Sequence, residues 1–407
     1  MGDKSAFVGI VTKLFDITGK ALSGEWGTDD PDGCGIPVLR TTNFTNVGKV
    51  NYDNVVTRNI QKKNISDKLL KKGDIIIEKS GGTDKNPVGR VIYFEGEENK
   101  YLFNNFTGLL RVKDKNEWYP KYVFYSMFAY YKRGGTRRFE NKTTGLHNLK
   151  LDDYIKRLDI QKASYVDQVH VCKLLDCVRL QIDNMERELE LLDELIKARF
   201  VEMFGDPIEN TYSFPILKLG ELSELITKGA SPSWQGYSYT EDSTQTLFVT
   251  SENVREGYMD FSSIKYVEDA FNEKQKRSMI QKGDYLINIV GASIGRAAQF
   301  NMDCKANMNQ AAALVRIKDN TISDNYLLYY LNSDKAQMMY NSMKSDTGRA
   351  NLSLQDIANL EILVPDLTLQ VKFSSFVQEV DKSRSRIQKS LEASQELFDS
   401  LMQEYFG

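Results

Sequence analysis

Two long stretches of the chain place apolar residues three or four positions apart, with charged residues between them. The first covers residues 165–206 and the second residues 367–407. This spacing is typical of a helix that packs along another helix. The first stretch could extend for about 60 Å at about 1.5 Å per residue, longer than an ordinary core helix. We therefore predict two spacer helices that pack against each other. The expected contact residues are Leu174, Val178, Met185, Leu189, Leu192, Ile196, Phe376, Val380, Ile387, Leu391, Phe398 and Leu401.

The two stretches also match each other at a constant shift of 202 residues. Glu194-Leu195 recurs as Glu396-Leu397, and Phe204-Gly205 recurs as Phe406-Gly407. Upstream the shift drifts, as loops of unequal length would require. There the matched segments are Lys72-Gly73-Asp74 with Lys282-Gly283-Asp284, Gly89-Arg90 with Gly295-Arg296, and Thr144-Gly145 with Thr347-Gly348. The chain is therefore predicted to run as globular unit, helix, globular unit, helix.

The sequence of each globular unit predicts short strands and short helices. Apolar runs entered through turns, such as residues 75–77 and 285–287, predict strands, and so do the runs 158–160 and 360–364 that end the units. Aromatic-rich segments at residues 122–131 and 325–331 predict helices. The expected fold is α+β with an internal pseudo-twofold repeat. Its expected divisions are residues 1–164, 165–206, 207–366 and 367–407.

Composition narrows the class of protein. With 41% hydrophobic and 11% aromatic residues, the 407-residue chain can build real cores. No apolar run is long enough to cross a bilayer, and no signal peptide is visible. Four cysteines without a CxxC pair favour reduced thiols, and we expect a cytoplasmic protein. The net charge of −3 hides a basic stretch over residues 132–142, which could face phosphate.

Catalytic signatures are absent from the sequence. Only two histidines occur, and a zinc site from His170, Cys172 and Cys177 would lack a fourth ligand. The glycine-rich segment 291–295 lacks the spacing of a nucleotide-binding loop. Glu140-Asn141-Lys142 supplies only half of a nuclease motif. We therefore expect no catalytic residue, no metal and no cofactor bound by this chain.

Turns at equivalent places in the two units carry side chains suited to DNA. Arginine and lysine match guanine edges and phosphates, whereas asparagine matches adenine edges. The candidate DNA contacts are Arg40, Asn43, Lys79, Ser80, Lys85, Arg90, Arg133, Arg137, Arg138, Lys142, Thr144, Ser251, Asn253, Ser293, Arg296, Lys344 and Arg349. Glycines and some asparagines in these turns could equally fix backbone geometry.

The complete chain resembles the specificity subunits of type I restriction-modification systems. The resemblance rests on motifs that occur twice in one order: Lys-Leu-x-Asp/Glu at residues 13–16 and 218–221, the Lys-Gly-Asp strand entry, the Gly-Arg turn, and a helix ending in Phe-Gly. It implies two target-recognition domains on an antiparallel coiled coil, each reading half of a two-part site in double-stranded DNA. It also implies two methyltransferase subunits as partners and, through them, restriction subunits. S-adenosylmethionine, ATP and magnesium would belong to those partners.

The first unit departs from the family pattern. It has an acidic stretch at residues 24–31 where the second unit has Gly229-Ala230-Ser231-Pro232-Ser233. The two units should therefore read different half-sites. Three alternatives remain open at this point: a recognition subunit with a fused methyltransferase-nuclease partner, a coiled-coil scaffold with no role in DNA binding, and a free-standing enzyme.

Overall fold

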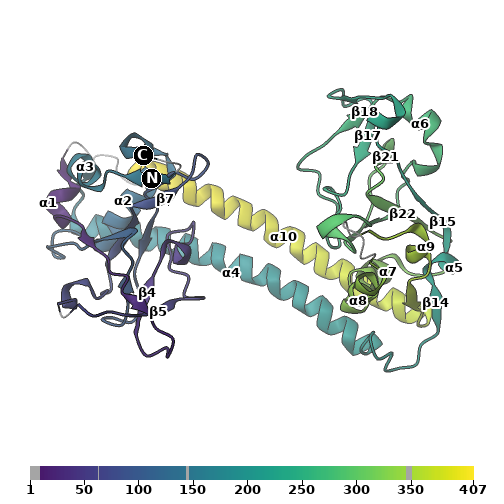
Figure 1. Ribbon diagram of the computed structural model, residues 1–407, viewed down its shortest axis with the longest axis horizontal. Helices are drawn as coiled ribbons and strands as arrows, with labels where there is room; N and C mark the ends of the chain where they lie inside the picture. Colours follow the sequence, from purple (N-terminus) through teal and green to yellow (C-terminus); the bar gives the residue numbers. More distant parts are fainter. Residues whose placement is uncertain (1–9, 63, 144–145, 345–350) are drawn as a thin grey trace. The chain divides into compact units, whose positions relative to one another are not determined.

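A computed structural model describes residues 10–62, 64–143, 146–344 and 351–407 (Figure 1). By its contacts the chain divides into two compact units. Unit 1 comprises Met1–Glu186 with Lys389–Gly407, and unit 2 comprises Arg187–Gln388. This division cuts both long helices, whereas the sequence suggested helices separate from the globular units.

Unit 1 is built from small sheets around short helices. Strands β1 (Val11–Lys13) and β13 (Asp159–Gln161) pair with each other. The central sheet has the order β2 (Leu22–Ser23), β10 (Thr107–Leu110), β6 (Ile75–Glu78) and β8 (Val91–Tyr93). A second sheet has the order β3 (Thr28–Asp29), β5 (Val56–Asn59), β4 (Ile36–Leu39) and β9 (Leu102–Phe103). A third has the order β11 (Glu140–Thr143), β12 (Leu146–Leu149) and β7 (Ser80–Gly82). The helices are α1 (Leu14–Thr18), α2 (Pro120–Lys132) and α3 (Leu151–Arg157), with 3-10 turns η2 (Thr41–Asn43), η3 (Ser66–Lys68) and η4 (Gly135–Phe139).

Unit 2 repeats this plan. Strands β14 (Ile216–Lys218) and β23 (Glu361–Leu363) pair, as β1 and β13 do. The central sheet is β15 (Ser223–Lys228), β22 (Ala312–Ile317), β19 (Tyr285–Asn288) and β20 (Ala297–Gln299). The second sheet is β16 (Tyr239–Thr240), β18 (Tyr266–Val267), β17 (Thr246–Val249) and β21 (Ala306–Met308). Helices are α5 (Leu219–Leu222), α6 (Phe271–Lys274), α7 (Asp324–Leu331), α8 (Asp334–Met343) and α9 (Leu354–Ala358), with 3-10 turns η5 (Ser233–Gln235), η6 (Lys276–Ser278) and η7 (Gly291–Ser293). The predicted repeat and the α+β class are confirmed.

The Lys-Gly-Asp motif holds a buried ion pair at the start of the central strand. In unit 1 the Asp74 carboxylate is 1% exposed and accepts two hydrogen bonds from Arg111, both of 2.7 Å. In unit 2 Asp284 accepts bonds of 2.8 and 2.7 Å from Arg316. Each carboxylate also accepts a backbone N–H three residues upstream. This two-bond geometry is the strongest form of a carboxylate–arginine pair, so it fixes the turn to the neighbouring strand in both units.

The long helices α4 (Tyr165–Phe204) and α10 (Leu367–Phe406) contribute to both cores. In unit 1 the Phe406 ring of α10 lies 5.1 Å from the Tyr122 ring of α2. In unit 2 the Phe204 ring of α4 lies 4.7 Å from the Tyr326 ring of α7. The repeated Phe-Gly ending therefore marks a packing contact. Helix α4 follows the N-terminal segment of unit 1 and ends in the core of unit 2, and α10 follows unit 2 and ends in the core of unit 1.

The pairing of the helices is antiparallel. Within unit 2, Asp193 of α4 accepts a hydrogen bond of 2.6 Å from Arg384 of α10. Further along α4, the Phe200 ring lies 5.4 Å from the Phe373 ring, so residue numbers rise on α4 as they fall on α10. All of the residues expected in the contact seam are buried or half-buried. Near the middle of the helices, Met185, Leu189 and Ile387 are only half-buried.

The buried ion pair gives a stability prediction. We expect Asp284→Asn to destabilise unit 2 by about 3 kcal/mol, because a charged Arg316 would lose its partner in a partly buried place. Urea unfolding measures the change. The control Lys305→Ala removes an exposed ion pair to Asp269 and should cost at most about 1 kcal/mol. Equal losses from the two variants would contradict the structural role of the motif.

Candidate nucleic-acid interface

The Gly-Arg turn follows the central strand in both units and has the same backbone geometry in each. The Glu78 N–H donates to the Arg90 carbonyl at 2.9 Å, and the Asn288 N–H donates to the Arg296 carbonyl at 2.9 Å. Glu78 and Asn288 are thus equivalent residues, one acidic and one neutral. The arginine of each turn therefore has a different electrostatic environment.

Arg90 is committed to the fold of unit 1. Its guanidinium donates to the carbonyls of Phe44 (3.1 Å) and Thr41 (2.9 Å), which ties the turn to η2. It also lies 3.5 Å from a Glu78 carboxylate oxygen. Burial raises the pKa of Glu78, and the charge of Arg90 opposes that rise. The structure therefore gives Arg90 a positioning role within unit 1, and its contact with DNA stays a prediction.

Arg296 is free in unit 2. Its side chain is exposed, and within the described part of the chain no hydrogen bond or ion pair of its guanidinium occurs. The buried Asn288 amide instead donates to the Ser251 carbonyl (2.9 Å) and the Ser293 hydroxyl (3.2 Å). Two further candidates, Ser251 and Ser293, thereby contact the Asn288 amide and help to hold this turn. Arg296 remains available to a nucleic acid.

Asn43 and Asn253 hold equivalent turns in the two units. Asn43 is 1% exposed, accepts the Arg40 N–H at 3.0 Å, and donates to the Asn51 and Asp53 carbonyls. Asn253 accepts the Thr250 N–H and donates to the carbonyls of Asp260 and Ser263. Both ends of each amide are used, so these side chains fix equivalent turns and cannot reach a base edge without breaking them.

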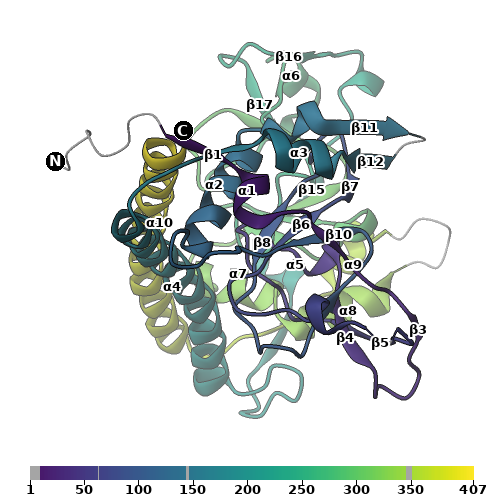
Figure 2. The same cartoon turned by 90° about the vertical axis from the view of Figure 1, so that its left-hand side faces the viewer.

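Several basic candidates of unit 1 lie around β7, η4 and the β11–β12 hairpin. The hairpin pairs with β7 and projects on the side of unit 1 opposite α4 and α10 (Figure 2). Arg137 of η4 is exposed and donates to the Asp84 carbonyl at 3.1 Å, which brings η4 beside the exposed Lys85. Arg138 lies over the Phe139 ring at 4.8 Å. This group forms the basic face of unit 1.

The remaining candidates are more scattered. Lys79 is half-buried near the Ser23 hydroxyl (3.4 Å), and burial together with the charge of Lys68 lowers its pKa. Ser80 lies in β7, Arg40 donates to the Asn54 carbonyl at 2.7 Å, and Lys344 donates to the Asn341 amide oxygen. Lys142 belongs to β11, while Thr144 and Arg349 lie outside the described residues.

Arg133 lies at the end of α10. Its guanidinium donates to the Phe406 carbonyl at the end of α10. An arginine at this position donates a hydrogen bond to a carbonyl that has no partner within the helix. Its positive charge also interacts favourably with the negative end of the helix dipole. The basic stretch 132–142 is therefore divided. Its first two residues face the helix pair, and Arg137 and Arg138 belong to the basic face.

The described residues contain no group of three or more His, Cys, Asp or Glu placed to hold a metal ion. The acidic residue of the Glu140-Asn141-Lys142 triplet is committed elsewhere: Glu140 accepts the Val88 N–H at 3.1 Å and lies 3.2 Å from the His147 ring. All four cysteines are free. Among the described helices, none has the length and apolarity needed to span a membrane.

Two features of the interface escaped the sequence analysis. One is the difference between Glu78 and Asn288, which a strand-by-strand alignment of the repeat could have shown. The other is the placement of Lys132 around one hollow with Arg179 of α4 and Asp399 of α10, which are distant from it in sequence. No local signal points to this placement.

The two Gly-Arg turns give a paired prediction. We expect Arg296→Ala to weaken duplex binding, with a salt slope reduced by about one if the contact is to phosphate, and to leave stability nearly unchanged. Arg90→Ala should mainly lower stability, because three groups lose their donor. Fluorescence anisotropy and urea unfolding of both variants measure these effects. An Arg296→Ala chain that binds duplex DNA as tightly as the wild type would contradict the assignment.

Comparisons with known proteins agree with this architecture. The family model for the type I restriction modification DNA specificity domain matches residues 214–395. The MjaX type I restriction enzyme specificity subunit of Methanocaldococcus jannaschii is 20% identical, over 93% of this chain and 90% of the relative. The EcoKI specificity subunit of Escherichia coli is 19% identical, over 88% of this chain and 77% of the relative.

Solved structures show the same fold. A type I restriction-modification S subunit from M. genitalium superposes with a TM-score of 0.58 at 16% identity, over 100% of this chain and 98% of that one. A chain from a study of complex assembly and conformational transition of the type I R-M system gives 0.58 at 14% identity, over 98% and 97%. Over nearly its whole length the chain is thus similar to type I restriction-modification specificity subunits, and residues 214–395 match the DNA specificity domain of such systems.

Proposed function

We propose that this chain directs a type I restriction-modification complex to a two-part DNA sequence, with one half-site read by each unit. The observation that carries the proposal is the pair of equivalent Gly-Arg turns. The same backbone turn carries Arg90 in unit 1, which is paired with Glu78, and Arg296 in unit 2, which is exposed. Units of one fold with different exposed chemistry suit two different half-sites, because direct reading depends on which side chains reach the base edges.

In this proposal the chain recognises DNA and catalyses no reaction. Two methyltransferase subunits bind to it, and restriction subunits join through them. S-adenosylmethionine, ATP and magnesium act on those partner subunits, and the complex works in the cytoplasm. The absence of catalytic motifs from the sequence and the pseudo-twofold repeat, which offers two similar docking positions, support this division of labour.

A domain exchange tests the reading of half-sites. Residues 213–366 are replaced by the corresponding segment of another specificity subunit, and the methylated sites in DNA from cells carrying the complex are mapped by sequencing. We expect one half of the site to change while the other half is retained. The wild-type chain serves as the control. A change in both halves, or in neither, would refute the modular assignment.

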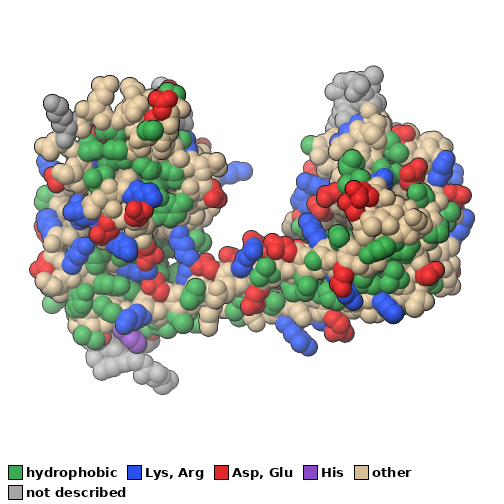
Figure 3. Space-filling model, turned by 90° about the horizontal axis from the view of Figure 1, so that it is seen from below, with side chains coloured by type: hydrophobic (Ala, Val, Ile, Leu, Met, Phe, Trp, Pro, Cys, Tyr) green, Lys and Arg blue, Asp and Glu red, His purple; other side chains and the backbone are tan. Residues whose placement is uncertain are grey.

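The helices offer repeat-equivalent apolar contacts to a partner. Leu195 and Leu397 occupy the same repeat position, and they are 47% and 48% exposed. Along the helices, apolar side chains lie between charges of both signs (Figure 3). Solvent exposure of leucine at both equivalent positions favours a docking contact for each of two partner subunits.

We expect Leu195→Asp and Leu397→Asp each to weaken methyltransferase binding about tenfold, since an apolar contact would be replaced by a buried charge. The matched control is Leu180→Asp, because Leu180 is 59% exposed and its repeat equivalent is the polar Lys382. Sedimentation velocity of the mixed subunits measures the affinity. If Leu180→Asp is as damaging as the other two, the equivalent leucines have no special role.

A further inference from the structure

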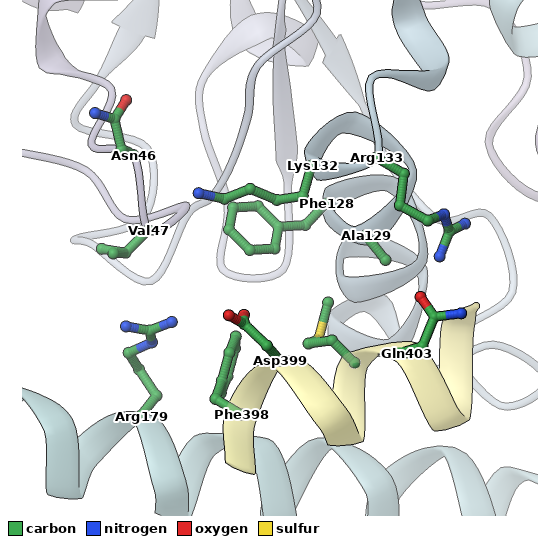
Figure 4. Close-up of a pocket in the computed structure, with 11 residues that line it drawn as sticks. Asn46, Val47, Phe128, Ala129, Lys132, Arg133, Arg179, Phe398, Asp399 and Gln403 are labelled. Atoms are coloured by element: carbon green, nitrogen blue, oxygen red, sulfur yellow. The ribbon is translucent and has the colours of Figure 1, made fainter. Parts of the chain in front are cut away.

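A hollow of about 360 Å³ lies in unit 1 between α2, α4 and α10 (Figure 4). Its walls include Phe128 of α2 and Phe398 and Met402 of α10. Three cations line it, Lys132, Arg133 and Arg179, against one carboxylate, Asp399. In Figure 4 Lys132, Arg179 and Asp399 point toward the same space. The hollow therefore combines apolar walls with an excess of positive charge.

Two of the three cations of this hollow, Lys132 and Arg179, are poorly compensated, whereas Arg133 donates to the Phe406 carbonyl. The Arg179 guanidinium lies 4.2 Å from the centre of the Phe398 ring. Within the described residues, no hydrogen bond or ion pair of the Lys132 or Arg179 side chain occurs. The pKa of Lys132 is lowered because neighbouring atoms displace water and because Arg179 is near, although Asp399 opposes the shift. An anionic group entering the hollow would find two cations that have neither a hydrogen bond nor an ion pair with the described residues.

Unit 2 has a hollow of about 280 Å³ at the equivalent place. Lys197 occupies the repeat position of Asp399, Phe200 that of Met402, and Glu256 that of Asn46. Its charges are Lys197 and Lys335 against Asp206, Glu256 and Asp334. The two hollows thus share their position in the repeat and an apolar wall at Met402 and Phe200, but differ in the sign of their excess charge.

We propose that the hollow of unit 1 binds an acidic side chain, together with neighbouring apolar atoms, from the methyltransferase subunit. This assignment rests on the proposed function. The shared apolar walls suit insertion of a protein side chain, whereas a phosphate contact needs no such walls. Charge complementarity therefore points to an acidic protein segment at unit 1.

Binding of the full-length chain to the methyltransferase subunit of the same restriction system tests the proposal, with affinity measured at low and high salt. Lys132→Glu should weaken binding about tenfold at low salt and less at high salt, because screening reduces the repulsion. The matched control is Lys335→Glu in the unit 2 hollow. It changes the net charge of the chain equally and should alter affinity by less than about twofold.

Asp399→Asn supplies the opposite test, since misfolding cannot mimic a gain in affinity. Removal of the lone carboxylate should tighten binding about two- to fivefold at low salt. Equal losses from Lys132→Glu and Lys335→Glu, or unchanged or weaker binding by Asp399→Asn, would overturn the proposal. So would a Lys132→Glu chain that loses affinity for duplex DNA and keeps its affinity for the methyltransferase subunit. A wild-type chain that does not bind this subunit would overturn the proposed function as well.

Discussion

The contact between a helix-terminal phenylalanine and a buried tyrosine completes the hydrophobic core of each unit. Phe406 against Tyr122 and Phe204 against Tyr326 are repeat-equivalent pairs, and each joins the last turn of a long helix to a short helix beside the β1–β13 or β14–β23 pair. Such aromatic pairs combine large apolar area with a preferred geometry. Because the phenylalanine comes from the helix that follows the other unit, neither core is complete from its own repeat alone. The spacer helices are therefore structural parts of both units.

The same arrangement explains the distribution of charge around the helix ends. Arg133 satisfies the Phe406 carbonyl, and Arg179 covers the Phe398 ring. These arginines stabilise the junction of helix and globular unit, and the basic face of unit 1 lies elsewhere, around η4 and β7. One basic stretch of sequence thus serves both a structural junction and a candidate DNA surface.

The helices and the repeat could be predicted because their signals are redundant. Many apolar positions agree on one period, and the constant shift of 202 residues relates two copies of it. The interface was harder to predict for a physical reason. The sequence alone does not tell whether an asparagine in a turn bonds to the backbone, as Asn43 and Asn253 do, or to a base. Arg90 and Arg296 share a motif, and their different environments depend on Glu78 and Asn288, which lie across a strand pair. An alignment of the repeat can show the difference between Glu78 and Asn288, whereas the hydrogen bonds of Asn43 and Asn253 are seen only in the three-dimensional structure.

The division of the chain into units has a consequence for its synthesis on the ribosome. Unit 2 is continuous in sequence, from Arg187 to Gln388, whereas unit 1 includes both Met1–Glu186 and Lys389–Gly407. Proteins generally fold from the N-terminus as they emerge. Here the N-terminal unit must wait for residues 389–407 to supply Phe398 and Phe406. The unit that is started first is thus completed after unit 2, and until those residues emerge its Tyr122 and Tyr125 surface stays uncovered, a place where a nascent chain needs protection from aggregation.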